Sequence, residues 1–176
     1  MVLKALKNLF GGTDERAAVR PLYQAIVAEA RAAHWYDRGQ VADTIDGRFD
    51  MVNVVLALVL MRMEGLGEEA RLPSALLAET FVEDMDAQLR ELGIGDIVVG
   101  KHIGKMMGAL GGRLGVYRAA FAPGEEPCEA LVRNLYRGNA PDAAAMDHVT
   151  DSLRALATRL DTLSLPDLLA GRMASA

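Results

Sequence analysis

Residues 81–113 read FVEDMDAQLRELGIGDIVVGKHIGKMMGALGGR, and this stretch decides the fold that the sequence predicts. In its first half, apolar side chains recur at the spacing that places them on one face of an α-helix: Phe81, Val82, Met85, Leu89 and Leu92. Gly93 suits a left-handed helix C-cap, Gly95 allows a turn, and Asp96 can accept hydrogen bonds from the first amides of another helix. The stretch therefore predicts a helix, a tight turn and a second helix.

The second helix of this stretch combines a core face with a row of glycines. The core face is predicted to hold Val99, Ile103, Met106, Met107 and Leu110. Beside it, a glycine recurs at every fourth residue: Gly100, Gly104, Gly108 and Gly112. Because each interior glycine costs roughly 1 kcal/mol relative to alanine, we expect another backbone to pack closely there. That backbone can belong to the protein's own bundle, which is the simpler interpretation, or to a partner.

The composition favours an all-α fold. The chain has 176 residues, of which 51% are hydrophobic and only 5% aromatic, so the core must consist mainly of Leu, Ala, Val and Met. The most apolar segment, residues 49–63, is too long for an ordinary strand and too short and polar for a membrane span, and it predicts a central helix. We predict a single-domain all-α bundle of about seven or eight helices over residues 13–176, preceded by a separate segment, residues 1–12.

Helical spacing and turn residues outline the remaining elements. After Pro21, the spacing turns Leu22, Ile26, Ala30 and Ala33 inward, and residues 37–48 read as a surface connection with turns at Gly39 and Gly47. A short helix is predicted after Arg113, another after Pro127, and a long one after Pro141, which turns Met146, Val149, Leu153, Leu156 and Leu160 inward. A last short helix is predicted in the tail around Leu165 and Leu168.

Several motifs in order resemble the ubiquinol–cytochrome c chaperone family. They are FVEDMDAQLRELGIGDIVVGK from Phe81, Lys105-Met106, Gly112-Arg113 and the RNLY at Arg133–Tyr136. The resemblance covers roughly residues 36–136 and implies a bacterial assembly chaperone for the cytochrome bc1 complex, respiratory complex III, that binds newly made cytochrome b. A small second assembly subunit is a further partner that the sequence leaves open. The chain departs from the family pattern at Val55, Gly104 and Gly108.

The stretch that carries the resemblance also supplies the predicted partner-binding residues. Basic side chains there are expected to face lipid headgroups or client loops, acidic ones with Arg90 to hold a partner, and methionines to adapt to an apolar client. Charge is unevenly distributed, since residues 64–86 hold seven acids and one base, whereas residues 97–124 hold four bases and no acid. The predicted set is Asp84, Met85, Asp86, Arg90, Gly95, Asp96, Gly100, Lys101, Lys105, Met106, Arg113, Arg133 and Asn134.

The first twelve residues, MVLKALKNLFGG, form a short basic amphipathic segment. Two interpretations stay open: Lys4, Lys7 and Phe10 contact an anionic membrane surface, or the segment docks on the bundle. Because no long Arg- and Ser-rich leader precedes it, we expect a bacterial cytoplasmic protein that is peripheral to the inner face of the cytoplasmic membrane.

Other classes of function receive little support from the sequence. A net charge of −5 argues against nucleic acid as the main partner, and the single Cys128, expected to be a small buried hydrophobe, forms no internal disulfide. His34, His102 and His148 lack metal-ligand spacing, and no local motif suggests a nucleophile with its base. We therefore predict no enzymatic activity, cofactor or metal. The alternative function is a soluble protein-binding adaptor of the same fold without a membrane client.

Overall fold

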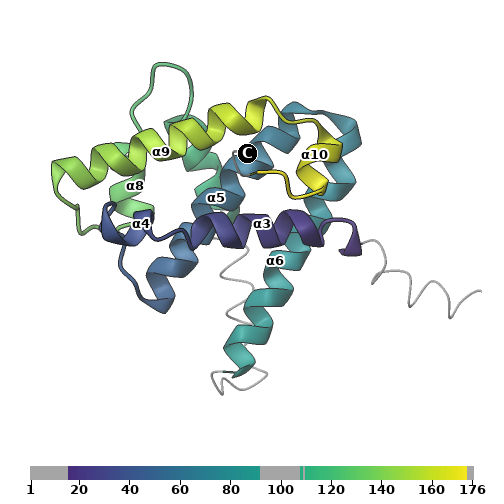
Figure 1. The fold of residues 1–176 in the computed structure, drawn as a ribbon, viewed down its shortest axis with the longest axis horizontal. Coiled ribbons are helices and arrows are strands. Elements are labelled where there is room, and N and C mark those ends of the chain that lie inside the picture. Colours follow the sequence, from purple (N-terminus) through teal and green to yellow (C-terminus); the bar gives the residue numbers. More distant parts are fainter. Residues whose placement is uncertain (1–15, 92–107, 109, 174–176) are drawn as a thin grey trace, which may run out of the picture.

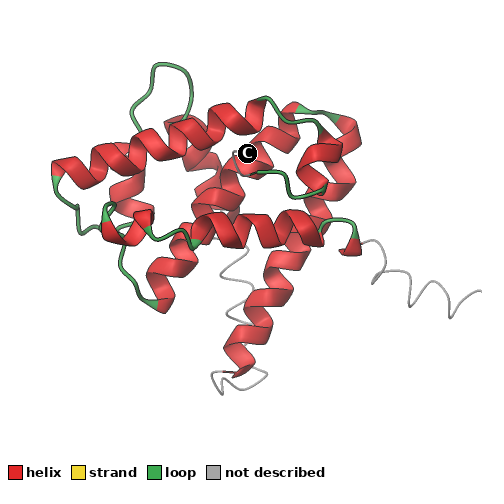
Figure 2. Ribbon diagram, viewed as in Figure 1, coloured by secondary structure: helices red, strands yellow, loops and turns green. Residues whose placement is uncertain are grey.

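The computed structural model describes residues 16–91, 108 and 110–173, and within these ranges every regular element is helical (Figures 1 and 2). The predicted all-α fold is confirmed. The elements are α3 (Arg20–Ala30), α4 (His34–Asp37), α5 (Ile45–Gly65), the 3-10 helix η1 (Glu68–Ala70), α6 (Arg71–Glu91), a helix over residues 110–120, α8 (Cys128–Asn134), α9 (Ala143–Asp161) and α10 (Leu165–Leu169).

Helix α5 is the centre of the bundle, as its composition predicts, and it packs against α3, α6 and α9. Its start at Ile45 corrects the predicted surface connection, which extended to residue 48. Thr44 caps the helix by accepting a hydrogen bond from the Gly47 amide at 3.1 Å. Gly47 therefore lies in the first helical turn, and it must be glycine because a Cβ would lie 2.0 Å from the Ala42 carbonyl oxygen.

Helix α3 packs against α5, and α4 follows the end of α3 (Figure 1). Leu22, Ile26 and Ala30 are buried as predicted, whereas Ala33 is exposed, because α3 ends at Ala30 and Ala33 is the N-cap of α4. Trp35 of α4 is fully buried and its indole donates to the Glu29 carbonyl at 2.8 Å. This bond gives the Glu29 carbonyl, at the end of α3, a second donor beside the Ala32 amide at 3.1 Å.

Helix α6 confirms the first half of the predicted helix, turn and helix. Phe81 and Met85 are buried, and the Phe81 ring stacks on Phe49 of α5 at a centroid distance of 5.9 Å. Beyond this contact, α6 crosses α3 and continues away from the rest of the bundle (Figure 1). The predicted turn at residues 93–96 and the first part of the second helix lie outside the described residues.

The C-terminal helices follow the predicted spacing closely. Asp142 caps α9 by accepting from the Ala145 amide at 2.8 Å, and the inward face of α9 is Val149, Leu153, Leu156 and Leu160, with Met146 half-buried. Helix α10 returns the chain to α3, where Gly171, with a φ of 73°, packs against the Pro21 carbonyl. In the part of the chain that the structure describes, no helix has the length and apolarity needed to cross a membrane.

The glycine row does not show the close packing that we expected. Gly108 and Gly112 are exposed, and no atom of the described residues lies within 4 Å of the position that a Cβ would take on either. The backbone of a neighbouring helix in the bundle therefore does not explain these two glycines. Gly100 and Gly104 lie outside the described residues.

Candidate partner-binding surface

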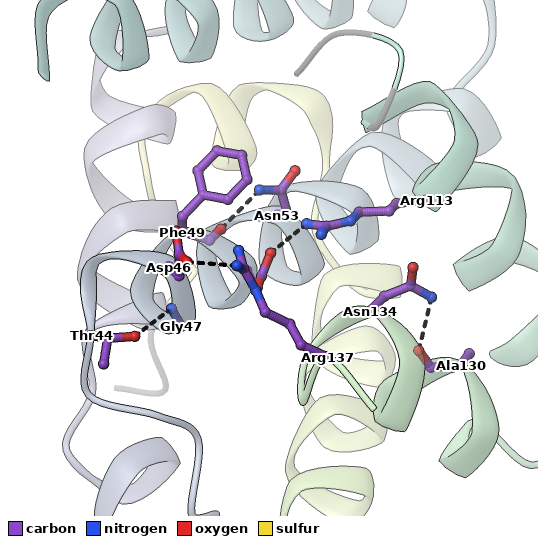
Figure 3. A network of polar contacts seen from close by, with 10 residues as sticks. Thr44, Asp46, Gly47, Phe49, Asn53, Arg113, Ala130, Asn134 and Arg137 are labelled. Carbon is purple, nitrogen blue, oxygen red and sulfur yellow. Dashed lines mark hydrogen bonds and ion pairs between the residues drawn. The ribbon is translucent and has the colours of Figure 1, made fainter. Parts of the chain in front are cut away.

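A polar cluster inside the bundle is built around Asp50, and Figure 3 shows the side chains of Asp46, Arg113 and Arg137 that belong to it. The Asp50 side chain is fully buried in the most apolar helix, where an unpaired carboxylate would be very costly. Arg113 donates to one carboxylate oxygen through Nη1 at 2.7 Å, and Arg137 donates to the other through Nε at 2.5 Å. Arg137 also pairs with Asp46 at 2.6 Å. The two carboxylates and two guanidiniums thus neutralise one another.

The cluster joins three segments that are far apart in the sequence. Asp46 and Asp50 lie one turn apart on α5, Arg113 comes from the helix over residues 110–120, and Arg137 follows α8. Arg137 adopts a left-handed conformation, with a φ of 53°, which turns the chain back toward α5. Pairing with the Asp50 carboxylate, followed by that of Asp46, raises the pKa of the Arg137 guanidinium, so its positive charge is secure.

This arrangement corrects the expected orientation of Arg113, which was expected to face lipid headgroups or client loops. Instead the Arg113 side chain is only 18% exposed, with its guanidinium on Asp50 and 5.9 Å from the Phe49 ring centroid. The physical reason is that leaving Asp50 unpaired costs more than withdrawing most of Arg113 from water, whereas Arg137 keeps 46% of its side chain exposed. Asp50 is the one acid of the apolar segment 49–63, which was the sequence signal for this cluster, but the sequence does not say which bases pair with it.

Two polar atoms near the cluster are buried without a partner among the described residues. They are the Tyr117 hydroxyl and the Oδ1 of Asn53, whose Nδ2 donates to the Phe49 carbonyl at 2.8 Å. Burial raises the pKa of Tyr117 far above its usual value, while the nearby Arg113 charge acts in the opposite direction. Tyr117 therefore remains a neutral phenol. The cluster as a whole holds α5, the helix over residues 110–120 and the turn after α8 together.

The predicted residues on α6 lie on a different surface. Asp84 accepts a hydrogen bond from the Tyr23 hydroxyl of α3 at 2.7 Å, and burial, together with this bond, raises the pKa of Tyr23 strongly. Met85 is only 8% exposed and belongs to the core, whereas Asp86 is half-buried. The structure thus brings Asp84 against α3 and turns Met85 inward.

The other predicted residues are only partly covered by the structure. Arg133 is exposed on α8, and the Asn134 side chain donates to the Ala130 carbonyl of its own helix at 2.9 Å. Among the described residues, no hydrogen bond or ion pair joins Arg133 or Asn134 to α6. The remaining side chains lie outside the described part: Arg90, Gly95, Asp96, Gly100, Lys101, Lys105 and Met106, together with Lys4, Lys7 and Phe10 at the membrane-surface segment.

An open groove of about 650 Å³ lies between α3 and α6. On the α6 wall, Glu83 pairs with Arg16, which also bonds to Glu79 at 3.1 Å. Sequence analysis identified Asp84 but missed the α3 wall, because nothing in the spacing of α3 indicates which helix lies opposite. The groove is lined by Arg20, Tyr23, Gln24, Val27, Ala28, Arg31, Thr80, Glu83 and Asp84.

A pair of histidines also escaped the sequence analysis. Nδ1 of His34 in α4 lies 3.1 Å from Nε2 of His148 in α9, so one ring donates a hydrogen bond to the other. Within the described residues, no third His, Cys, Asp or Glu joins them to make a metal site. Cys128 is partly exposed at the start of α8, not fully buried as expected.

These features define an all-helical protein with an internally neutral core cluster and an open, charge-lined groove. The family of ubiquinol-cytochrome C chaperones matches residues 37–175, and the chain belongs to this family. The chain is also similar to a solved protein described as the Cbp3 homolog from Brucella abortus, at 31% identity and a TM-score of 0.77. That match covers 97% of this chain and 94% of the other. Among curated proteins, no sequence matches. The resemblance stated from the motifs is therefore confirmed.

Proposed function

We propose that this chaperone assists assembly of the cytochrome bc1 complex by binding newly made cytochrome b at the membrane surface. The observation that carries the proposal is the family match, which covers residues 37–175 and supports a chaperone role in ubiquinol–cytochrome c reductase assembly. The similarity to the Brucella abortus protein over nearly the whole chain supports the same role. Membership in a chaperone family also supports a function in binding rather than catalysis.

The geometry suits a protein that holds an unfinished partner on its outside. Asp50 and its two arginines fix α5, the helix over residues 110–120 and the turn after α8 as one rigid platform. The groove between α3 and α6 is open to solvent and large enough for part of a client chain. We infer that the client contacts the bundle along α6, where the predicted Asp84 and Asp86 lie.

We place the protein on the inner face of the cytoplasmic membrane through basic residues. Lys101, Lys105 and the segment with Lys4, Lys7 and Phe10 are the proposed membrane or client contacts. Each basic residue close to an anionic leaflet adds about 1 kcal/mol of attraction, so several together are needed for stable association. A second small subunit remains a proposed additional partner.

The decisive experiment is a pull-down of tagged protein from detergent-solubilised membranes of its own cell, followed by mass spectrometry. We expect the wild type to recover cytochrome b and the double variant Lys101→Glu with Lys105→Glu to recover several-fold less. The matched control is Arg71→Glu with Arg172→Glu, which makes the same change in net charge at two side chains that are 79% and 72% exposed. If the wild type recovers soluble partners alone, cytochrome b is not its client.

The adaptor alternative is separated from the chaperone by liposome flotation. A chaperone that works at the membrane should float with vesicles containing anionic lipid, and deletion of residues 1–12 should reduce the floating fraction. A soluble adaptor should stay at the bottom of the gradient with and without this segment.

A further inference from the structure

The two walls of the groove between α3 and α6 differ in how far their charged side chains are paired. On the α6 wall, Glu83 already pairs with Arg16 and Asp84 accepts from Tyr23. On the α3 wall, Arg20 and Arg31 are both exposed, and neither forms an ion pair with any of the described carboxylates. The groove therefore offers two positive charges that no carboxylate of the described residues pairs with.

These two arginines have a defined spacing. Arg20 is the first residue of α3 and Arg31 is its C-cap, so they are eleven positions apart, which corresponds to about 16 Å along the axis. Between them the α3 wall presents Tyr23, Gln24, the partly buried Val27 and the exposed Ala28, none of which carries a charge. The wall thus has a cation at each end and an uncharged middle three turns long.

We propose that this groove binds a helical segment of a partner protein that carries acidic residues about three turns apart, one for Arg20 and one for Arg31. Such a segment lies along α3, places its apolar side on Val27 and Ala28, and keeps its acids away from Glu83 and Asp84. The inference rests on the proposed function only in treating the groove as a binding surface. It does not require that cytochrome b supply the segment.

Charge and shape together favour a protein segment over an anionic membrane. A flat anionic surface that approached the two arginines would also meet the carboxylates of the α6 wall, and like charges repel. A helix can carry its acids on one side only, so these acids can pair with the arginines of α3 without facing the carboxylates of α6. A groove between two helices also accommodates a third helix through its side-chain ridges.

The test uses the full chain and two labelled, alanine-rich helical peptides of about 18 residues, with binding followed by fluorescence anisotropy at low ionic strength. One peptide carries glutamates at the spacing of Arg20 and Arg31, and the other carries lysines at the same positions. The test variant is Arg20→Glu with Arg31→Glu. The control is again Arg71→Glu with Arg172→Glu, whose side chains do not line the groove.

We expect the wild type to bind the glutamate peptide at least about tenfold more tightly than the lysine peptide, and the groove variant to lose this preference. The control should retain affinity within about twofold. Equal binding of the two peptides by the wild type, or an equal loss in both variants, would overturn the proposal. Displacement of the peptide by anionic vesicles, with the same dependence on Arg20 and Arg31, would identify a membrane as the occupant instead.

The peptide experiment and the membrane pull-down can fail independently. Recovery of cytochrome b together with equal binding of both peptides leaves the chaperone function intact and removes the groove assignment. Preference for the glutamate peptide without recovery of cytochrome b keeps the groove and removes cytochrome b as the client.

Discussion

The Asp50 cluster and the α3–α6 groove contain the same kinds of charged side chain, arginines and carboxylates, but in the two places these side chains serve different purposes. In the cluster, each guanidinium meets a carboxylate within 2.7 Å, and the Asp50 side chain is completely withdrawn from water. In the groove, the acids are satisfied by Arg16 and Tyr23, while Arg20 and Arg31 point to solvent without a carboxylate partner among the described residues. Charges that are fully paired inside contribute to the fold, whereas charges left over on a concave surface are available for a partner.

Removal of the Asp50 carboxylate should have the largest effect on the free energy of unfolding. Asp50→Ala leaves the mostly buried Arg113 without its acceptor and Arg137 with Asp46 alone, so we expect a loss of about 3–5 kcal/mol. Urea denaturation followed by circular dichroism measures this change. Asp46→Ala is the matched control, because its side chain is 68% exposed, and it should cost less than about 1 kcal/mol. Equal effects of the two substitutions would show that burial does not distinguish them.

Loss of the Tyr23 hydroxyl should affect both stability and the groove. Tyr23→Phe removes the bond from α3 to Asp84 on α6 and leaves a half-buried carboxylate with one donor fewer, which should cost about 1.5–3 kcal/mol. Because Asp84 lines the groove, its less compensated charge should also weaken binding of an acidic peptide. Tyr36→Phe is the control, since its hydroxyl bonds only to the Ala30 carbonyl at 2.7 Å, away from α6. If Tyr23→Phe lowers stability but leaves peptide affinity unchanged, the Tyr23–Asp84 bond serves the fold and not binding in the groove.

The histidine pair should make stability depend on pH. Burial, together with the neighbouring His148, lowers the pKa of His34, while Glu29 acts to raise it and Arg38 to lower it. Since the folded state binds the proton less tightly than the unfolded state, this contribution to stability is present above the ordinary histidine pKa of about 6.5 and is lost as the pH falls below it. Because His34 is partly exposed, the loss should be no more than about 1 kcal/mol.

Urea midpoints between about pH 7.5 and pH 5 measure this dependence, in a window where ordinary carboxylates do not yet titrate. His34→Gln retains a polar side chain without a titrating ring, and it should flatten the profile. A profile as steep as that of the wild type would assign the pH dependence to other groups.

Much of the fold could be predicted from the sequence, because helix faces and caps are local. The apolar run of residues 49–63, the inward face of α9 and the cap at Asp142 depend on neighbours within a few positions, and all are present. The predicted burial of Ala33 was wrong because α3 ends before it, where the Trp35 and Tyr36 side chains fold back and donate to carbonyls at the end of α3. The predicted start of α5 was wrong because Gly47 was interpreted as a turn residue. It is glycine because the Ala42 carbonyl lies against it inside the first helical turn.

The candidate site was predicted less well, because its contacts connect residues far apart in the sequence. Asp50 meets Arg113 and Arg137 across 63 and 87 residues, and His34 meets His148 across 114. Periodicity says that a residue faces inward but not which side chain it meets there. The α3 wall of the groove was missed for the same reason, although Asp84 on the opposite wall was identified from the family motif.

The smallest expected effect on stability is that of the groove arginines themselves. Arg20→Ala with Arg31→Ala should change the free energy of unfolding by no more than about 0.5 kcal/mol, because neither side chain pairs with a described carboxylate. The same substitution should weaken binding of the acidic peptide, and the salt dependence of that binding should become shallower. Urea denaturation and anisotropy titrations at two ionic strengths measure the two effects on one sample. A stability loss comparable to that of Asp50→Ala would mean that these arginines serve the fold, and then the difference between the cluster and the groove would disappear.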